Sequence, residues 1–174
     1  TDPAVATRIY STNGEVIHEL FMMKRLYIPI SKIPDHVVTA LLSSEDRSFH
    51  KHWGVNIKGI PRAILANLTS GKISQGFSTI TMQVSRNLYE SIGFEKSYWR
   101  KVKEIITAIE LERNYSKEEI LEMYLNTVYF GHGVYGIEAA SKKYFDKKAE
   151  SLSIDEGAML IGLLPSPKNY SPFN

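Results

Sequence analysis

The sequence predicts a mostly α-helical domain that is preceded by a short N-terminal β-hairpin. Three observations favour this fold class. Apolar residues recur at helical spacing through most of the chain after residue 33, two β-prone runs flank Asn13-Gly14, and capping residues mark several helix starts. The chain has 174 residues and 43% hydrophobic content, which suits a single buried core. We expect one domain over residues 31–174, after a linker and hairpin over residues 1–30.

Composition excludes several classes of protein. The chain has 21 basic and 19 acidic residues, a net charge of +2, so its composition does not favour a nucleic-acid partner. It has no cysteine, which rules out a disulfide framework and a thiolate metal site. Its longest uncharged apolar run, residues 158–164, is far shorter than the roughly 20 residues of a spanning helix. We therefore expect an excised domain whose membrane anchor has been left out.

Helical patterns account for most of the chain. Pro34 suits the first turn of a helix that ends at Glu45. Ser116 and Glu119 have the spacing of a capping box. Further helices are expected over residues 57–68, 99–113, 137–144 and 153–164, the last of them apolar nearly all round and therefore central to the core. In the helix of residues 99–113, the predicted buried stripe consists of Val102, Ile105, Ile106 and Ile109.

Glu45 lies where the local pattern calls for a buried apolar residue. Val38, Leu41 and Leu42 follow helical spacing, and Glu45 takes the next position on the same stripe. A carboxylate held against apolar neighbours is poorly solvated in its charged form, which favours proton transfer and makes Glu45 a catalytic candidate. The alternative is that the helix frays after Ser44 and that Glu45 is an ordinary surface residue.

Residues 76–88 predict a second helix that could bind an anion at its start. Ser78 and Thr79 resemble the N-terminal cap of this helix, where unpaired N–H groups attract anions. Ser78, Met82 and Arg86 are spaced along one face, which we expect to be the binding face. The apolar stripe opposite that face consists of Ile80, Val84 and Leu88.

Residues 87–99 mix aromatic, aliphatic and polar side chains without a helical period. This composition suits a bilayer interface, and the alternative is a loop that covers the core. The glycine-rich residues 129–136 lack the order of a nucleotide-binding loop, so we expect a connector there, with a noncatalytic His132.

Residues 45–54 read E-D-x-x-F-x-x-H-x-G, which resembles the first signature of the family 51 peptidoglycan glycosyltransferases. Further signatures of that family follow in order at residues 76–83, 100–104, 117–126 and 163–173. The second differs from the usual family pattern at Phe77 and Met82, where a small residue and a glutamine are usual, and Arg86 fills the position of the lysine that usually follows it. The resemblance implies a lysozyme-like fold over most of the chain.

The resemblance also implies roles for individual residues. Glu45 would be the general base and Glu104 the second acidic residue of the site. From spacing alone, Lys101 and Glu104 would instead read as a surface salt bridge. The residues implied in substrate binding are Asp46, His52, Ser78, Thr79, Gln83, Arg86, Lys96, Arg100 and Lys101.

The implied reaction is the polymerisation of lipid II into glycan strands, with release of undecaprenyl pyrophosphate. The implied partners are lipid II, the lipid-linked strand, the membrane surface at the outer face of the bacterial cytoplasmic membrane and a transpeptidase domain in the full-length chain. A divalent cation, Mg or Mn, could accompany the pyrophosphate. Two other functions stay open: a glycan-cleaving enzyme in which Glu45 is a general acid, and a noncatalytic module that binds lipid-linked glycan.

Overall fold

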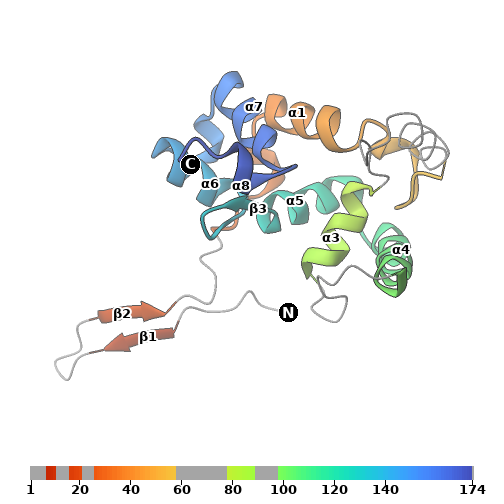
Figure 1. Cartoon of the computed structure of the whole chain (residues 1–174), viewed down its shortest axis with the longest axis horizontal. Coiled ribbons are helices and arrows are strands. Elements are labelled where there is room, and N and C mark those ends of the chain that lie inside the picture. The colour runs from red at the N-terminus through yellow and green to blue at the C-terminus, as the bar shows by residue number, and fades with distance from the viewer. Residues whose placement is uncertain (1–6, 11–15, 21–25, 58–77, 89–97, 174) are drawn as a thin grey trace.

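The computed structural model describes residues 7–10, 16–20, 26–57, 78–88 and 98–173 (Figure 1). This part of the chain is mainly helical, which confirms the predicted fold class. The helix expected over residues 57–68 lies almost wholly outside the described residues, as do most of residues 87–99. The helices are α1 (Asp35–Glu45), α3 (Ile80–Leu88), α4 (Tyr98–Asn114), α5 (Lys117–Thr127), α6 (Ile137–Phe145), α7 (Ile154–Leu163) and α8 (Pro167–Tyr170), with 3₁₀ turns η1 (Ile30–Lys32), η2 (Phe49–Lys51) and η4 (Ala149–Ser151).

Two short antiparallel hairpins accompany the helices. Strands β1 (Thr7–Tyr10) and β2 (Val16–Leu20) pair with Thr7 opposite Leu20, which confirms the predicted N-terminal hairpin. Strands β3 (Tyr129–Gly131) and β4 (Val134–Tyr135) form a second hairpin in the segment predicted to be only a connector. Gly131, His132 and Gly133 all have positive φ, so the turn depends on the two glycines.

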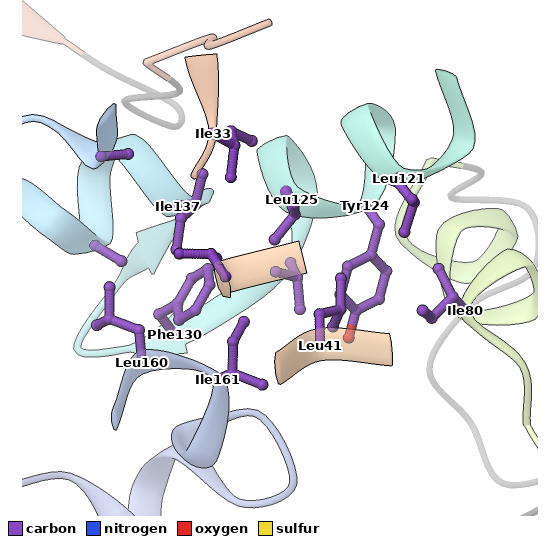
Figure 2. Packing of buried hydrophobic residues seen from close by; sticks show 14 of the residues in the cluster. Ile33, Leu41, Ile80, Leu121, Tyr124, Leu125, Phe130, Ile137, Leu160 and Ile161 are labelled. Atoms are coloured by element: carbon purple, nitrogen blue, oxygen red, sulfur yellow. The ribbon is translucent and has the colours of Figure 1, made fainter. Parts of the chain in front are cut away.

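The main core lies between α1, α5, α6 and α7. Leu41 of α1, Tyr124 and Leu125 of α5 and Ile161 of α7 are all buried in one cluster (Figure 2). Helix α7 begins at Ile154, as its capping pattern predicts. It is not buried all round, however, because Ala158 and Gly162 are exposed.

The segment before α1 is attached to α5 by side-chain hydrogen bonds. The Asn126 side chain accepts a hydrogen bond from the Ile28 N–H and donates one to the Ile28 carbonyl, each 2.8 Å long. Glu122 accepts hydrogen bonds from the Tyr27 hydroxyl and the Ile30 N–H. Ile28 is itself buried in the core, so packing of the domain begins before residue 31, where we placed its boundary.

Helix α4 buries a different face from the one predicted. Val102 and Ile106 are 43% and 54% exposed, and Trp99 on the same face is 77% exposed. The buried face instead carries Glu104, Ala108 and Leu111, at i, i+4 and i+7. The prediction was wrong because a charged residue occupies a position of the buried stripe and a small alanine occupies the next.

The predicted faces of α3 also need correction. Met82 is 0% exposed, so it does not lie on an open binding face between Ser78 and Arg86. Ile80 and Val84 are buried as predicted, together with Thr81 and Ser85. Gln83 and Arg86 are only partly buried and form the open side of this helix.

Candidate active site

Glu45 is the last residue of α1, and its carboxylate faces α3. The helix ends there because Asp46 leaves the helical region, with φ of −157°. Glu45 is half-buried, one turn after the buried Leu41. Its Oε2 accepts a 3.0 Å hydrogen bond from the Gln83 side-chain amide. The alternative in which the helix frays before Glu45 is therefore wrong.

Gln83 connects Glu45 to a buried tyrosine. The Tyr124 hydroxyl donates a 3.2 Å hydrogen bond to Gln83 Oε1, and Gln83 Nε2 donates to Glu45. Burial raises the pKa of Tyr124, and the negative charge of Glu45 raises it further. From the sequence, Tyr124 lies on the apolar stripe of the helix that Ser116 caps, which predicts a core position and no role in the site. A tyrosine on an apolar stripe is a signal in itself, because a buried hydroxyl needs a polar partner.

Asp46 and His52 hold the loop after α1 against the start of α3. The Gly54 N–H donates to His52 Nδ1, so Nε2 carries the proton and donates to Asp46 Oδ2 at 2.8 Å. The same Asp46 oxygen accepts from the N–H of Ile80, the first residue of α3. Both side chains are nearly covered, with 6% of His52 and 4% of Asp46 exposed. Asp46 thus contacts the start of α3, and His52 contacts Asp46; the substrate contact expected of both residues stays a prediction.

Thr79 is the N-cap of α3. Its hydroxyl donates to the Gly54 carbonyl at 2.6 Å and accepts a hydrogen bond from the Met82 N–H. The residue is 2% exposed. The helix start expected at Ser78 and Thr79 is confirmed. The Thr79 hydroxyl makes both of these hydrogen bonds within the protein, and its expected role in substrate binding stays a prediction.

Glu112 and Lys117 also hold α3 and the loop after α1 in place, which the sequence did not predict. The Thr81 hydroxyl donates to Glu112 Oε1 at 2.6 Å, and Lys117 donates to the same oxygen at 2.7 Å. Lys117 also donates to the His52 carbonyl and lies 4.4 Å from the centroid of the Phe49 ring. Thr81 and Glu112 are 31 residues apart and His52 and Lys117 are 65 residues apart, so no local spacing identifies these contacts.

Glu104 forms the centre of a cationic cluster between α3 and α4. Its carboxylate is 0% exposed and pairs with Arg86 Nε at 2.8 Å, Arg100 Nε at 3.2 Å and Lys101 Nζ at 2.5 Å. Burial alone would raise the pKa of Glu104, but hydrogen bonds from Arg86 and Lys101, with their charges, outweigh it and lower the pKa. Glu104 is therefore an ionised, buried anchor and not an exposed surface partner of Lys101.

The cationic cluster keeps an excess of positive charge. Three cations and one carboxylate give these four side chains a net charge of +2. Arg86, Arg100 and Lys101 each remain partly exposed, whereas Glu104 does not. Lys101 also donates to the Ser78 hydroxyl at 3.0 Å, which brings Ser78 to the edge of the cluster. Such a surface suits a polyanionic group.

Lys96 and a divalent cation are the two remaining components that the sequence led us to expect at the site. Lys96 lies outside the described residues. Within the described residues, no group of three or more His, Cys, Asp or Glu side chains could hold a metal ion. The contacts of Glu104 also do not fit direct metal ligation, because three cations already surround its oxygens.

Comparison with known proteins gives a consistent result. A family model described as "Transglycosylase" matches residues 13–174. The chain is 42% identical to penicillin-binding protein 1A of Aquifex aeolicus over 171 residues, which cover 98% of this chain and 23% of that protein. It is also 42% identical to penicillin-binding protein 1B of Escherichia coli over 176 residues, 99% of this chain and 20% of that protein. The chain thus spans about a fifth of the length of these relatives.

Proposed function

This chain belongs to the transglycosylase family, the peptidoglycan glycosyltransferases of family 51, and we propose that it joins lipid II units into glycan strands. The growing lipid-linked strand is the donor, and the GlcNAc 4-hydroxyl of lipid II is the acceptor. One observation carries this proposal: α3 contacts both the half-buried Glu45, through Gln83, and a cationic cluster of net charge +2, through Arg86.

Glu45 acts as the general base in this reaction. Its carboxylate takes the proton of the 4-hydroxyl as that oxygen attacks the anomeric carbon of the donor. The bond between that carbon and the pyrophosphate oxygen breaks, and undecaprenyl pyrophosphate leaves with the bonding electrons. Attack opposite to the leaving group inverts the configuration and gives a β-1,4 bond.

The cationic cluster stabilises the leaving group. Charge accumulates on the pyrophosphate as the bond breaks, and Arg86 and Lys101 are positioned to offset it. The planar guanidinium of Arg86 can donate two hydrogen bonds to a phosphate. Glu104 acts through these cations, because its carboxylate is fully buried and fixes both of them. We thus assign Glu104 a positioning role. The divalent cation stays a prediction, and no step here depends on it.

The charges disfavour the glycan-cleaving alternative. A hydrolase protonates a neutral sugar oxygen through a carboxylic acid, and its transition state develops positive charge on the sugar ring. Nearby arginine and lysine side chains would destabilise that charge. Pyrophosphate leaves as an anion and benefits from the same side chains.

We also propose that the exposed face of α4 contacts the membrane. Trp99, Val102 and Ile106 form an apolar stripe at the start of this helix, next to the segment whose composition suits a bilayer interface. None of the described helices is long and apolar enough to cross a bilayer. A parent protein with a membrane anchor and a transpeptidase domain, at the outer face of the cytoplasmic membrane, fits relatives that are named penicillin-binding proteins and are about five times longer.

Incubation of the chain with labelled lipid II tests the polymerase proposal. Gel separation should show a ladder of lengthened strands, and preformed strands should stay uncut. Glu45→Gln should abolish the ladder while the thermal midpoint stays close to that of the unchanged protein. Glu150→Gln, an exposed glutamate in η4, is the matched control and should leave the ladder unchanged. Shortened strands would instead support the hydrolase. No change in either substrate would support the binding module.

A further inference from the structure

We propose that Tyr124 is a positioning residue that orients Gln83, and through it the general base Glu45. The inference rests on the role proposed for Glu45 above. Tyr124 lies on α5, Gln83 on α3 and Glu45 at the end of α1, so the chain of hydrogen bonds links three helices.

The direction of these hydrogen bonds fixes the orientation of the Gln83 amide. An amide has a donor end and an acceptor end, and turning it over exchanges them. The Tyr124 hydroxyl donates to Oε1, which leaves Nε2 to donate to Glu45. In the reversed orientation, Oε1 would face the carboxylate of Glu45 and the two acceptors would repel each other.

The Tyr124 hydroxyl is well suited to this task. Its side chain is 0% exposed and packs in the core near Leu41 (Figure 2). A ring held by close packing keeps its hydroxyl in one place. Burial and the charge of Glu45 raise the pKa of Tyr124, so the hydroxyl keeps its proton and remains a donor.

Loss of the hydroxyl should therefore affect turnover more than binding. Tyr124→Phe keeps the ring and removes one hydrogen bond to Gln83, which frees the amide to rotate. We expect kcat to fall roughly three- to tenfold, the range that corresponds to one hydrogen bond. The KM for lipid II should change less than kcat does, because Tyr124 is 0% exposed and makes no contact with substrate itself.

Tyr144→Phe is the matched control. The Tyr144 hydroxyl donates a 2.8 Å hydrogen bond to the Phe130 carbonyl, outside the candidate site. It should change the thermal midpoint about as much as Tyr124→Phe does but leave kcat unchanged. The proposal is wrong if the two variants have equal kcat, or if Tyr124→Phe changes KM and not kcat.

A measurement without turnover tests the contact itself. The chain has two glutamines, Gln75 and Gln83, so ¹⁵N-glutamine labelling gives two pairs of side-chain amide signals, and Gln75→Ala assigns them. In the unchanged protein, the Gln83 signals should differ from those of free glutamine, and they should shift in Glu45→Ala, which adds no third glutamine. They should move toward the free-glutamine position in Tyr124→Phe. Gln83 signals at the free-glutamine position in the unchanged protein would overturn the proposal. This result needs neither a folded Tyr124→Phe variant nor polymerisation activity, so it is distinct from a failure of the proposed function.

Discussion

Glu104→Gln removes the charge at the centre of the cationic cluster and almost nothing else. The substitution keeps the shape of the side chain but leaves Arg86, Arg100 and Lys101 without their shared anion. Breaking a buried ion pair costs about 3–5 kcal/mol, because a charge remains without compensation. The three cations are 27%, 16% and 23% exposed and can turn partly toward water. We therefore expect the low end of this range, about 3 kcal/mol.

This cost should be visible in thermal unfolding and in turnover. For a domain of this size, about 3 kcal/mol corresponds to a fall of roughly 6–12 °C in Tm. Glu150→Gln breaks only an exposed contact with Lys148, 3.7 Å long, and should lower the free energy of unfolding by less than about 1 kcal/mol. Glu104→Gln should also slow polymerisation, because Arg86 and Lys101 lose the group that aims them. An unchanged Tm in Glu104→Gln would refute the proposed role of this cluster in stability.

The pH dependence of stability gives a second test. The folded-state pKa of Glu104 is lowered from its ordinary value of 4.5. The stability that Glu104 contributes is therefore fully present above about pH 4.5 and is lost as pH falls through the lowered pKa. The difference in free energy of unfolding between the unchanged protein and Glu104→Gln should shrink below pH 4.5. A difference that grows in this range would contradict the assignment.

Two further predictions concern one side chain that is fully buried, Met82, and one that is largely exposed, Trp99. Met82 is fully buried, so Met82→Gln should lower the free energy of unfolding by about 1–3 kcal/mol and should not raise activity. Faster polymerisation at unchanged stability would show that this side chain reaches substrate. Trp99→Ser should weaken binding of the chain to anionic liposomes, measured by sedimentation, about tenfold, whereas Tyr170→Ser on α8 should not. Tyr170 is 60% exposed and Trp99 is 77% exposed, so both changes are made at accessible aromatic side chains. Equal binding of both variants would show that the exposed face of α4 does not enter the bilayer.

The sequence predicted well those features that local spacing determines. The helix from Pro34 to Glu45 and the capping box of Ser116 and Glu119 depend on neighbouring residues, and the structure confirms both. The burial of Glu104 was not predictable in this way. Its burial depends on Arg86, 18 residues away, whose charge makes a buried carboxylate tolerable. Periodicity assumes that buried positions are apolar, so it selected the wrong face of α4.

Helix α3 joins the two halves of the candidate site. Gln83 faces Glu45, the proposed general base, and Arg86, three residues later, faces the cationic cluster. A helix rises about 1.5 Å per residue, so these two residues lie about 4.5 Å apart along its axis.

The same helix is fixed at its start by groups from outside it. Asp46 accepts from the Ile80 N–H, Thr79 donates to the Gly54 carbonyl, and Thr81 donates to Glu112. A shift of α3 along its axis would break these hydrogen bonds and move Gln83 and Arg86 together. The first signature thus supplies the proposed base, and it also contacts the helix that carries Arg86, a cation proposed to act on the leaving group. In this way Asp46 and His52 can support the candidate site although their side chains are nearly covered.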